Sequence, residues 1–593
     1  MSNHTTLKKA LAELEKNKEQ FEAVHCKTHC VVLAGPGSGK TKTLTTAIAR
    51  TLKEEVIAPR AIGCITYNNE CAIELETRLS KLGVDTTGTN FIGTVHSFAL
   101  TQIIMPYSRC VESNIPQDFK VADLKECRIA IENAYKKIYQ DSGDPYKQWE
   151  FAKEKRNREL DRTLPIWKGH NKELAEFIEE YEQELRKKGL IDFDDMPLIA
   201  FRMIKENPWI CDAIEARFPI LFVDEYQDLG HGLHELVQLL CFDGNVRLFA
   251  VGDADQSIYG FTGANPELLQ SLTLRQDVQT FQLKFNYRSG TKIVKASSAA
   301  LNENRHYESP EDTPEGEIKF HPVNGGLEEQ AYFIVNKLLA ELNRKGFKNE
   351  NIAILYRAAW LGDKIVEALE DQQLPYHRTD GNSLIKRSSK FARFIEGCAK
   401  WVTGGWKDAE PPFRKLHNQA LIIVYGHHYT KNEEQQLALQ LIDFLQNSRS
   451  ITETANEWLL RFNQELVKPW MAVCRNNLQE WEICSELLEK TSPTSNKDMS
   501  LDLFAGKTEG TGRIILTTFH SSKGREFDAV ILFGVNNNVI PSSRDKTSPK
   551  ALKETRRLFY VAVTRPKNTL HLVFQKNNHS DFVADFYQRC EQE

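Results

Sequence analysis

One short stretch near the N-terminus has the residue types of a phosphate-binding loop. It reads Gly35, Pro36, Gly37, Ser38, Gly39, Lys40, Thr41, with Ala34 at the first motif position, where glycine is usual. The apolar run Cys30–Ala34 precedes the loop and Thr43–Ala49 follows it, so the pattern predicts a strand, a loop and a helix. Glycines let backbone N–H groups turn toward one phosphate, and a helix N-terminus attracts anions. We expect Lys40 to reach the β- and γ-phosphates of a nucleotide and Thr41 to hold Mg²⁺. A plain glycine turn is the alternative.

Two adjacent carboxylates, Asp224 and Glu225, directly follow the apolar run Phe218–Val223, which predicts a buried strand. Burying two carboxylates at the tip of a strand costs free energy unless a cation offsets their charge. We therefore expect Asp224 to hold Mg²⁺ through its water shell and Glu225 to orient and deprotonate an attacking water. Together with Lys40 and Thr41, this pair predicts hydrolysis of a nucleoside triphosphate.

Two glutamines are candidates for the two ends of the nucleotide. Gln256 follows the apolar run Val246–Val251, and its amide can hydrogen-bond the γ-phosphate or the attacking water. Gln20 precedes the loop, and a glutamine amide can pair with both N6 and N7 of adenine. The sequence therefore predicts ATP rather than GTP, with an ordinary surface glutamine as the alternative for Gln20.

Polar and aromatic residues gather where further predicted strands end. Such residues suit hydrogen bonds to phosphates and stacking on bases. The candidates are Thr66, Tyr67, Asn68, Thr94, His96, Tyr259 and Phe261. Helix capping is the alternative for Thr66 and His96, and core packing is the alternative for Tyr259 and Phe261.

The composition fits an ordinary globular protein of several domains. The chain has 593 residues and a formal net charge of −5, which does not exclude nucleic acid because a groove can be basic on an acidic body. No apolar run approaches the length of a membrane span, and the first residues lack the apolar core of a signal peptide, so we expect a cytoplasmic protein without a membrane partner. His25, Cys26, His29 and Cys30 could bind a metal, but a strand-entry turn is the favoured interpretation.

Further motifs make the chain resemble the superfamily 1A DNA helicases of the UvrD, Rep and PcrA type. In chain order the resembling segments are Asn286–Ser289, Ile352–Arg357, Thr517–Phe527 and Arg556–Arg565. The resemblance implies two RecA-like motor domains with ATP bound between them. It also implies that Arg288 and Arg565 approach the γ-phosphate, where an arginine finger contributes roughly 10³–10⁵ in rate.

The resemblance implies roles for three more residues. Tyr287 is expected to stack on adenine, Glu526 to face the nucleotide sugar, and His520 to contact single-stranded DNA. The resemblance implies the same DNA contact for Tyr67, Thr94, His96, Tyr259 and Phe261.

The expected fold is α/β, with two RecA-like P-loop motor domains, each a parallel sheet flanked by helices, and two helical insertions. By resemblance, motor domain 1A spans 1–99 and 190–284, and helical insertion 1B spans 100–189. Motor domain 2A spans 285–383 and 507–593, and a reduced helical insertion 2B spans 384–506. The basic run Lys153–Arg158 in 1B is interpreted as a solvated helix face rather than a DNA contact, and five tryptophans in 2B suit either a partner surface or a core.

Two functions follow from the resemblance. The first is an ATP-dependent DNA translocase or helicase of 3′→5′ polarity. The alternative is a DNA-sensing ATPase subunit of an anti-phage defence complex of the Gabija type, which would activate a partner nuclease through the 2B region. Features that favour the alternative are the compact 2B region, the short stretch after Phe574, and Thr262, which stands where the family has an arginine.

Overall fold

A computed structural model describes most of the chain and divides it into two compact units. The described residues are 3–84, 89–112, 115–116, 118–140, 143–260, 263–303, 305–386, 389–408, 410–426, 429–449, 453–474, 481–492, 499–506 and 512–592. The first unit comprises 1–318, 540–569 and 580–593, and the second comprises 319–539 and 570–579. The predicted second motor domain is thus shared between both units, and the four-domain division stays a prediction.

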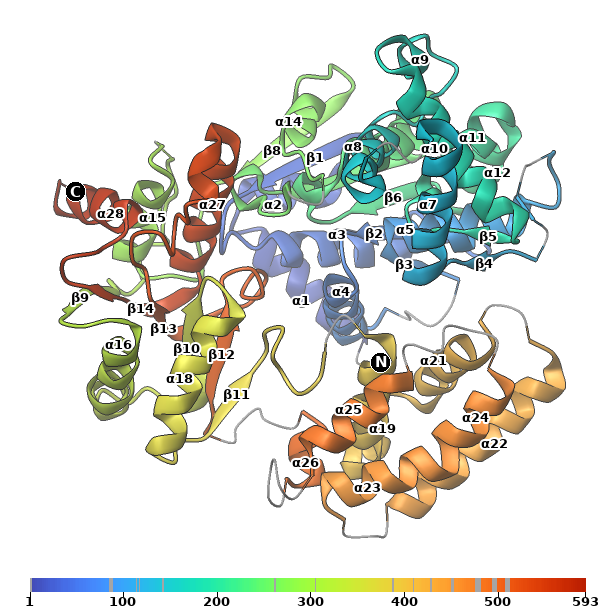
Figure 1. Cartoon of the computed structure of the whole chain (residues 1–593). Coiled ribbons are helices and arrows are strands. Elements are labelled where there is room, and N and C mark those ends of the chain that lie inside the picture. Colours follow the sequence, from blue (N-terminus) through green and yellow to red (C-terminus); the bar gives the residue numbers. More distant parts are fainter. Residues whose placement is uncertain are drawn as a thin grey trace. The chain divides into compact units, whose positions relative to one another are not determined.

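The first unit is built on a six-stranded sheet whose strand order is β3-β2-β6-β7-β1-β8 (Figure 1). Every neighbouring pair is parallel. The strands are His29–Ala34 (β1), Gly63–Thr66 (β2), Phe91–Thr94 (β3), Ile220–Val223 (β6), Arg247–Gly252 (β7) and Val278–Leu283 (β8). Because parallel strands share one carboxyl edge, the residues that follow β1, β2, β6 and β7 lie along the same side of the sheet.

Helices cover both faces of this sheet, and alternate residues of each strand enter two separate cores. Val31, Leu221 and Ala250 pack on one face, while Val32 and Phe222 pack on the other. Around the first core lie Val95–Phe98 (α5), Asp195–Glu206 (α11), Trp209–Arg217 (α12), His231–Gln238 (α13) and Glu267–Thr273 (α14). Around the second lie Asn3–Leu14 (α1), Lys18–His25 (α2), Lys40–Glu54 (α3) and Asn69–Lys81 (α4). Near-continuous apolar strands are what a doubly covered parallel sheet requires.

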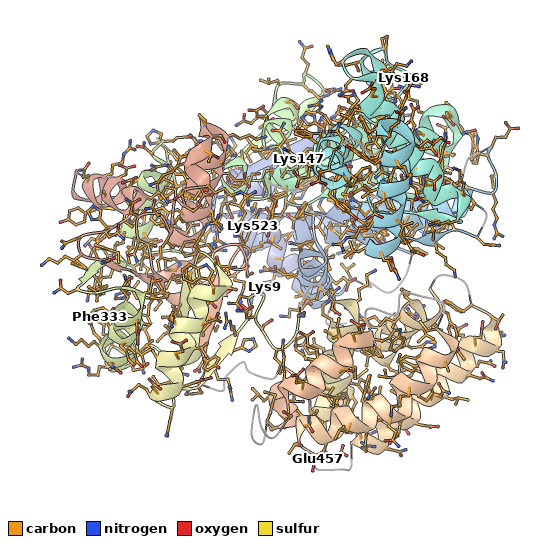
Figure 2. All side chains as sticks on the ribbon, viewed as in Figure 1. Lys9, Lys147, Lys168, Phe333, Glu457 and Lys523 are labelled. Carbon is orange, nitrogen blue, oxygen red and sulfur yellow. The ribbon has the colours of Figure 1, made fainter. Side chains whose placement is uncertain are left out.

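A helical segment follows β3, and all of its helices except the first surround a core of their own. Its helices are Met105–Tyr107 (α6), Leu124–Tyr139 (α7), Pro145–Arg158 (α8), Ile166–Gly169 (α9) and Lys172–Lys187 (α10), with the short parallel strands Lys120–Val121 (β4) and Leu190–Ile191 (β5). Lys147 and Lys168 are labelled on this segment in Figure 2. The core includes Trp167 and Phe177, both fully buried.

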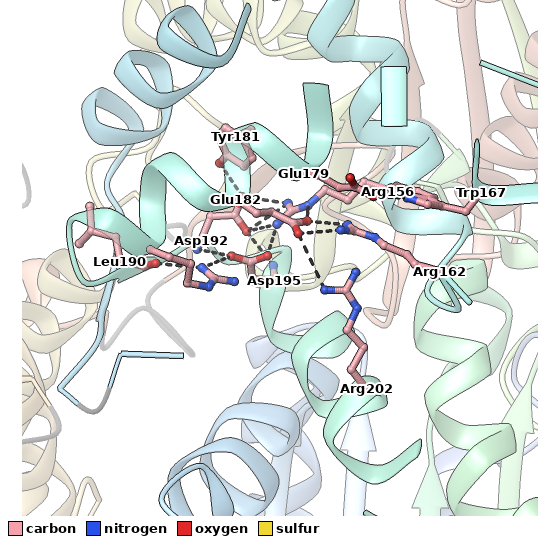
Figure 3. A network of polar contacts seen from close by, with 11 residues as sticks. Arg156, Arg162, Trp167, Glu179, Tyr181, Glu182, Leu190, Asp192, Asp195 and Arg202 are labelled. Carbon is pink, nitrogen blue, oxygen red and sulfur yellow. Dashed lines mark hydrogen bonds and ion pairs between the residues drawn. The ribbon is translucent and has the colours of Figure 1, made fainter. Parts of the chain in front are cut away.

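The basic run in α8 is not simply a solvated face, which corrects the interpretation from sequence. Arg156 is 1% exposed and forms ion pairs with Glu182, Asp192 and Asp195, which come from α10, the loop after β5, and the start of α11 (Figure 3). Arg158, two residues further on, is half-exposed. Arg156 therefore links elements in the interior of the first unit, because a buried charge requires partners of opposite charge.

The C-terminal elements of the first unit form a helical layer. Thr291–Leu301 (α15), Pro549–Val563 (α27) and Asp581–Gln592 (α28) pack on one another, although far apart in the sequence (Figure 1). Phe559 of α27 contacts Phe582 and Phe586 of α28.

The second unit holds another six-stranded sheet, of order β11-β12-β10-β13-β14-β9. Its strands are Glu317–Val323 (β9), Ile352–Tyr356 (β10), Tyr376–Arg378 (β11), Ile514–Thr518 (β12), Phe527–Phe533 (β13) and Pro566–Gln575 (β14). The unit boundary runs through β9 and β14. β10 pairs in parallel with β12 and β13, and β11 with β12. Leu327–Phe333 (α16), Leu339–Arg344 (α17) and Ala359–Asp371 (α18) flank the sheet. Two helix-flanked sheets with parallel pairing confirm the predicted fold class.

The remaining part of the second unit is helical. Its helices are Lys390–Lys400 (α19), Trp406–Asp408 (α20), Phe413–Tyr425 (α21), Lys431–Ser448 (α22), Ala455–Phe462 (α23), Lys468–Val473 (α24), Glu482–Lys490 (α25) and Leu501–Phe504 (α26). Four of the five tryptophans, Trp401, Trp458, Trp470 and Trp481, are buried in its core. Trp406 is 37% exposed and lies under the Arg449 guanidinium. The tryptophans therefore serve packing. Within the described ranges, no helix is long and apolar enough to cross a membrane.

Candidate active site

The glycine-rich loop leaves β1 and enters α3 at Lys40. Gly37 and Gly39 have φ angles of 67° and 83°, which side chains other than glycine rarely adopt. A Cβ at Gly39 would lie 2.5 Å from the Nε2 of Gln20. That amide nitrogen donates to the carbonyl of Ser38 at 2.9 Å, so the buried Gln20 is built into the wall of the loop.

Tyr287 and Gln20 occupy the same corner of the site, as the ATP prediction requires. Asn17 links them, since its Oδ1 accepts from the Gln20 N–H at 3.0 Å and its Nδ2 donates to the Tyr287 hydroxyl at 2.9 Å. The Tyr287 N–H donates to the carbonyl of Gly37 at 2.8 Å. The Tyr287 side chain is 51% exposed, which leaves an aromatic face at the rim of the loop.

The two carboxylates lie opposite Lys40, at the end of β6. Lys40 Nζ lies 3.3 Å from both carboxylate oxygens of Glu225. Asp224 is 5% exposed, and burial together with the adjacent Glu225 raises the pKa of its carboxyl to about 7, although Lys40 opposes the shift. Glu225 has φ 51°, in the left-handed region that costs a non-glycine residue free energy and that often marks functional sites.

A continuous chain of polar contacts runs from this carboxylate pair to Arg565. Gln227 Nε2 donates to Glu225, and Gln227 Oε1 accepts from the Asp253 N–H at 2.9 Å. Gln256 Nε2 donates to the Asp253 carboxylate at 2.5 Å, and Gln256 Oε1 accepts from Arg565 Nη2 at 3.2 Å. Gln256 is therefore fixed between an acid and an arginine.

The two predicted arginines lie close together inside the first unit. Arg565 is 1% exposed, and burial together with the neighbouring charge of Arg288 lowers the pKa of its guanidinium. Arg565 Nε donates to the Val561 carbonyl at 2.8 Å, while Asn286 Oδ1 accepts from the Arg288 N–H at 2.8 Å. Two like charges held at one place favour an anion between or beside them.

Comparison with known families agrees with these motifs. Residues 16–277 match the UvrD/REP helicase N-terminal domain, and residues 281–389 and 414–577 match the UvrD-like helicase C-terminal domain. The chain belongs to the UvrD-like helicase family. This confirms the resemblance inferred from the motifs.

The sequence similarity to known helicases extends over nearly the full length of this UvrD-like helicase. The ATP-dependent DNA helicase Rep of Buchnera aphidicola is 26% identical, over 92% of each chain. DNA helicase II of Escherichia coli is 26% identical, over 97% of this chain and 88% of the relative. The ATP-dependent DNA helicase PcrA of Staphylococcus aureus is 25% identical, over 94% of this chain and 82% of the relative.

Three residues that sequence reasoning missed contact the predicted site of this UvrD-like helicase. Gln227 is the link described above. Arg305 binds the Asp255 carboxylate through two nitrogens, at 2.6 and 2.9 Å, beside Gln256. The ring of Tyr307 lies against Gly35, since a Cβ there would be 2.2 Å from Tyr307 Cε1. Arg305 and Tyr307 stand outside every quoted motif, so no local pattern could indicate them.

The predicted DNA-contact residues of the first unit have mixed environments. The rings of Tyr67 and Tyr259 stack at 4.9 Å, and His96 stacks on Phe193 at 4.1 Å. Asn68 and Thr94 each cap a helix, whereas the alternative interpretation expects capping at Thr66 and His96. Thr66 is fully buried, and its hydroxyl has no partner among the described residues.

Three of the predicted residues lie outside the described part of the first unit. Phe261 lies outside the described residues. His520 and Glu526 belong to the second unit, after β12 and before β13.

The two histidines among the predicted metal candidates near β1 contact the backbone, while the thiols of Cys26 and Cys30 contact each other. His25 Nδ1 lies 2.8 Å from the Phe21 carbonyl, and His29 Nδ1 accepts from the Leu248 N–H at 3.1 Å. In the part of the chain that the structure describes, no three His, Cys, Asp or Glu residues gather as a metal site.

Proposed function

We propose that this UvrD-like helicase hydrolyses ATP to move along single-stranded DNA in the 3′→5′ direction and to separate duplex DNA. Its relatives carry the names ATP-dependent DNA helicase and DNA helicase II. The observation that carries the proposal is the unbroken path of contacts from Lys40 to Arg565, which passes through Glu225, Gln227, Asp253 and Gln256. That path joins the phosphate loop to an arginine more than 500 positions away, so events at the nucleotide can act on C-terminal elements.

Magnesium fits the oxygen donors at the end of β6. The buried Asp224 carboxylate, with its raised pKa, is destabilised as an anion and gains from a nearby divalent cation. Thr41, in the first turn of α3, offers a hydroxyl, and Mg²⁺ takes few protein ligands because it keeps several waters. The ion would neutralise charge on the phosphates.

Residues of the chain bind the nucleotide and assist its hydrolysis. Lys40 supplies a cation for the β- and γ-phosphates, and its present partner Glu225 is thereby released to accept a proton from water. Gln227 orients the Glu225 carboxylate by donating a hydrogen bond to it. Gln256 and Arg565 face the γ-phosphate together with Arg288, and Tyr287 and Gln20 hold adenine.

The proposal is tested by ATPase rates with and without single-stranded DNA, and by unwinding of a forked duplex. Wild type should show DNA-stimulated hydrolysis and unwinding, and Lys40→Ala should lose both because the phosphates lose their main cation. Lys53→Ala, on the exposed far end of α3, is the matched control and should keep both activities.

Two outcomes would contradict this function. Hydrolysis that is indifferent to DNA would exclude any DNA motor. Stimulated hydrolysis without unwinding would favour the DNA-sensing ATPase predicted as the alternative. Neither the fold nor the similar proteins favour that alternative, a partner nuclease or a role in antiviral defence over the helicase.

A further inference from the structure

The carboxyl edge of the second sheet brings the ends of β10 and β12 together. Tyr356 pairs with Thr518 in the parallel register, and the Phe519 N–H donates to the Tyr356 carbonyl at 2.9 Å. The segments leaving the two strands therefore start side by side. Trp360 lies four residues beyond Tyr356, and His520 lies two residues beyond Thr518. Both residues belong to the second unit.

Trp360 is unusual among the tryptophans of this chain. It is 55% exposed, the largest value of all nine, whereas six others are buried or partly buried and the remaining two, Trp209 and Trp406, are 44% and 37% exposed. Tryptophan carries the largest apolar surface of any side chain, so leaving more than half of it in water loses favourable burial. An exposed tryptophan at a strand end has an aromatic face available to a ligand.

The backbone that carries Trp360 is firmly held. Arg378, the last residue of β11, donates from Nη2 to the carbonyl of Ala359 at 2.5 Å and from Nη1 to Asp363 at 2.6 Å. Its Nε binds Asp380 at 2.7 Å. Arg378 therefore links the first turn of α18 to the end of β11. Because the backbone that carries the Trp360 ring is already ordered, binding a ligand there loses little conformational entropy.

The surroundings of the ring suit a polyanion. Arg357 follows β10, and Lys523 and Arg525 follow β12 on the segment that carries His520; Lys523 is labelled in Figure 2. Arg525 Nη1 donates to Thr379 Oγ1 at 2.9 Å, which fixes that cation beside the end of β11. Among the described residues, the acids at this edge include Asp363 and Asp380, which both pair with Arg378, and the exposed Glu526.

We infer that Trp360 stacks on a base of single-stranded DNA that passes along this edge. The inference rests on the proposed function and adds a contact that no motif of the chain indicated. A protein–base stack tolerates every base, because each has a π-face, while the nearby cations attract the phosphates. Trp360 therefore provides a DNA contact that does not depend on the base sequence, in addition to the predicted contact at His520.

The test is the affinity of full-length Trp360→Ala for a fluorescein-labelled 15-nucleotide oligodeoxythymidine, measured by anisotropy at fixed salt. Stacking predicts that binding weakens about 5- to 150-fold. An oligonucleotide of the same length with abasic sites throughout keeps the phosphates but has no bases, and the variant should bind it as wild type does. The dependence of affinity on salt should also be unchanged, since no phosphate contact is removed.

Two further variants separate stacking from a general loss of structure. Trp360→Phe keeps an aromatic face and should recover most of the affinity for oligodeoxythymidine. Trp209→Ala removes an exposed tryptophan of the first unit that packs against Tyr107, and it should bind as wild type. All variants are compared by their thermal unfolding midpoints.

The outcomes distinguish the inference from the function on which it rests. If wild type binds oligodeoxythymidine and Trp360→Ala binds it equally well, the stacking inference is wrong, and a protein partner becomes the better candidate for this ring. An equal loss of affinity for the abasic oligonucleotide also overturns it. If wild type itself does not bind oligodeoxythymidine, the proposed function fails first.

Discussion

Arg565 is the residue whose removal best separates nucleotide binding from hydrolysis. Its guanidinium is buried, lies near Arg288 and contacts Gln256 at 3.2 Å. Arg565→Ala should still bind ATP, because Gln20, Tyr287 and the glycine-rich loop remain, but turnover should fall by roughly 10³ or more. A fluorescent ATP analogue measures the first effect and phosphate release measures the second.

Arg275→Ala is the matched control for that substitution. Arg275 pairs with Asp277 on the surface of the same unit, so its loss should leave turnover unchanged. Unchanged turnover in Arg565→Ala would remove this arginine from the site.

His234 should make the stability of the first unit depend on pH. It is buried on α13, with Nδ1 2.8 Å from the Tyr226 hydroxyl, and burial lowers its pKa to about 4. An unfolded histidine titrates near 6.5, so the unfolded chain binds the proton more tightly and folding weakens as pH falls from about 6.5 to about 4. The loss is up to about 3 kcal/mol.

The glutamine variant His234→Gln tests this contribution. It keeps an acceptor for Tyr226 but has no ionisable group, so it should lose less stability than wild type over that acid range. Thermal unfolding across the pH range measures the difference, and His306→Gln, at an exposed position, should follow wild type. Parallel curves for wild type and His234→Gln would exclude His234 as the cause.

At the scale of the elements, the glycine-rich loop depends on a partner that comes from beyond α15. Tyr307 covers Gly35, and a Cβ at Gly35 would lie 2.2 Å from its ring, closer than real carbon atoms approach. Gly35→Ala should therefore displace the loop and weaken ATP binding by about tenfold, or roughly 1.4 kcal/mol. The backbone at Gly35 is not in the left-handed region, so strain does not add to the clash.

A double-mutant cycle checks this assignment. Gly35→Ala with Tyr307→Ala should recover most of the lost affinity, since the atoms that clash are gone, and neighbouring residues show coupling of about 0.5–3 kcal/mol. Tyr307→Ala alone measures what the ring contributes otherwise. Additive effects of the two substitutions would contradict direct contact.

At the scale of the whole molecule, contiguous patterns were predictable and contacts between distant residues were not. Apolar runs followed by the glycine-rich loop or by Asp224–Glu225 indicate strand ends of an α/β sheet, and the fold class and family are confirmed. Arg305 and Asp255 are 50 residues apart in the sequence, and only folding brings them into contact. The roles of the site residues stay predictions.

Arg156 is the clearest example of a contact that could not be predicted from the sequence. Its neighbours in the sequence are charged, as on a solvated helix face, but its neighbours in the fold are acids from other elements. Burial alone would lower the pKa of its guanidinium, but Asp192, Asp195 and Glu182 hold it above the usual value. The helical segment 105–187 is part of the first unit, and this cluster ties α8 and α10 to α11, which covers the first sheet (Figure 3).

Removing the ion pairs of Arg156 should destabilise the first unit alone. Arg156→Ala leaves Asp192 buried without a cation, whereas Glu182 keeps Arg162 and Asp195 keeps Arg186. Breaking a buried ion pair in this way costs about 3–5 kcal/mol. Arg158→Ala, at the half-exposed end of the same run, should change stability by less than about 0.5 kcal/mol. Hydrogen exchange should quicken in α8, α10 and α11 of Arg156→Ala and stay unchanged in α19 to α26, because those helices have a separate core. Equal exchange in both variants would mean that apolar packing around Trp167, rather than the ion pairs, holds the segment in place.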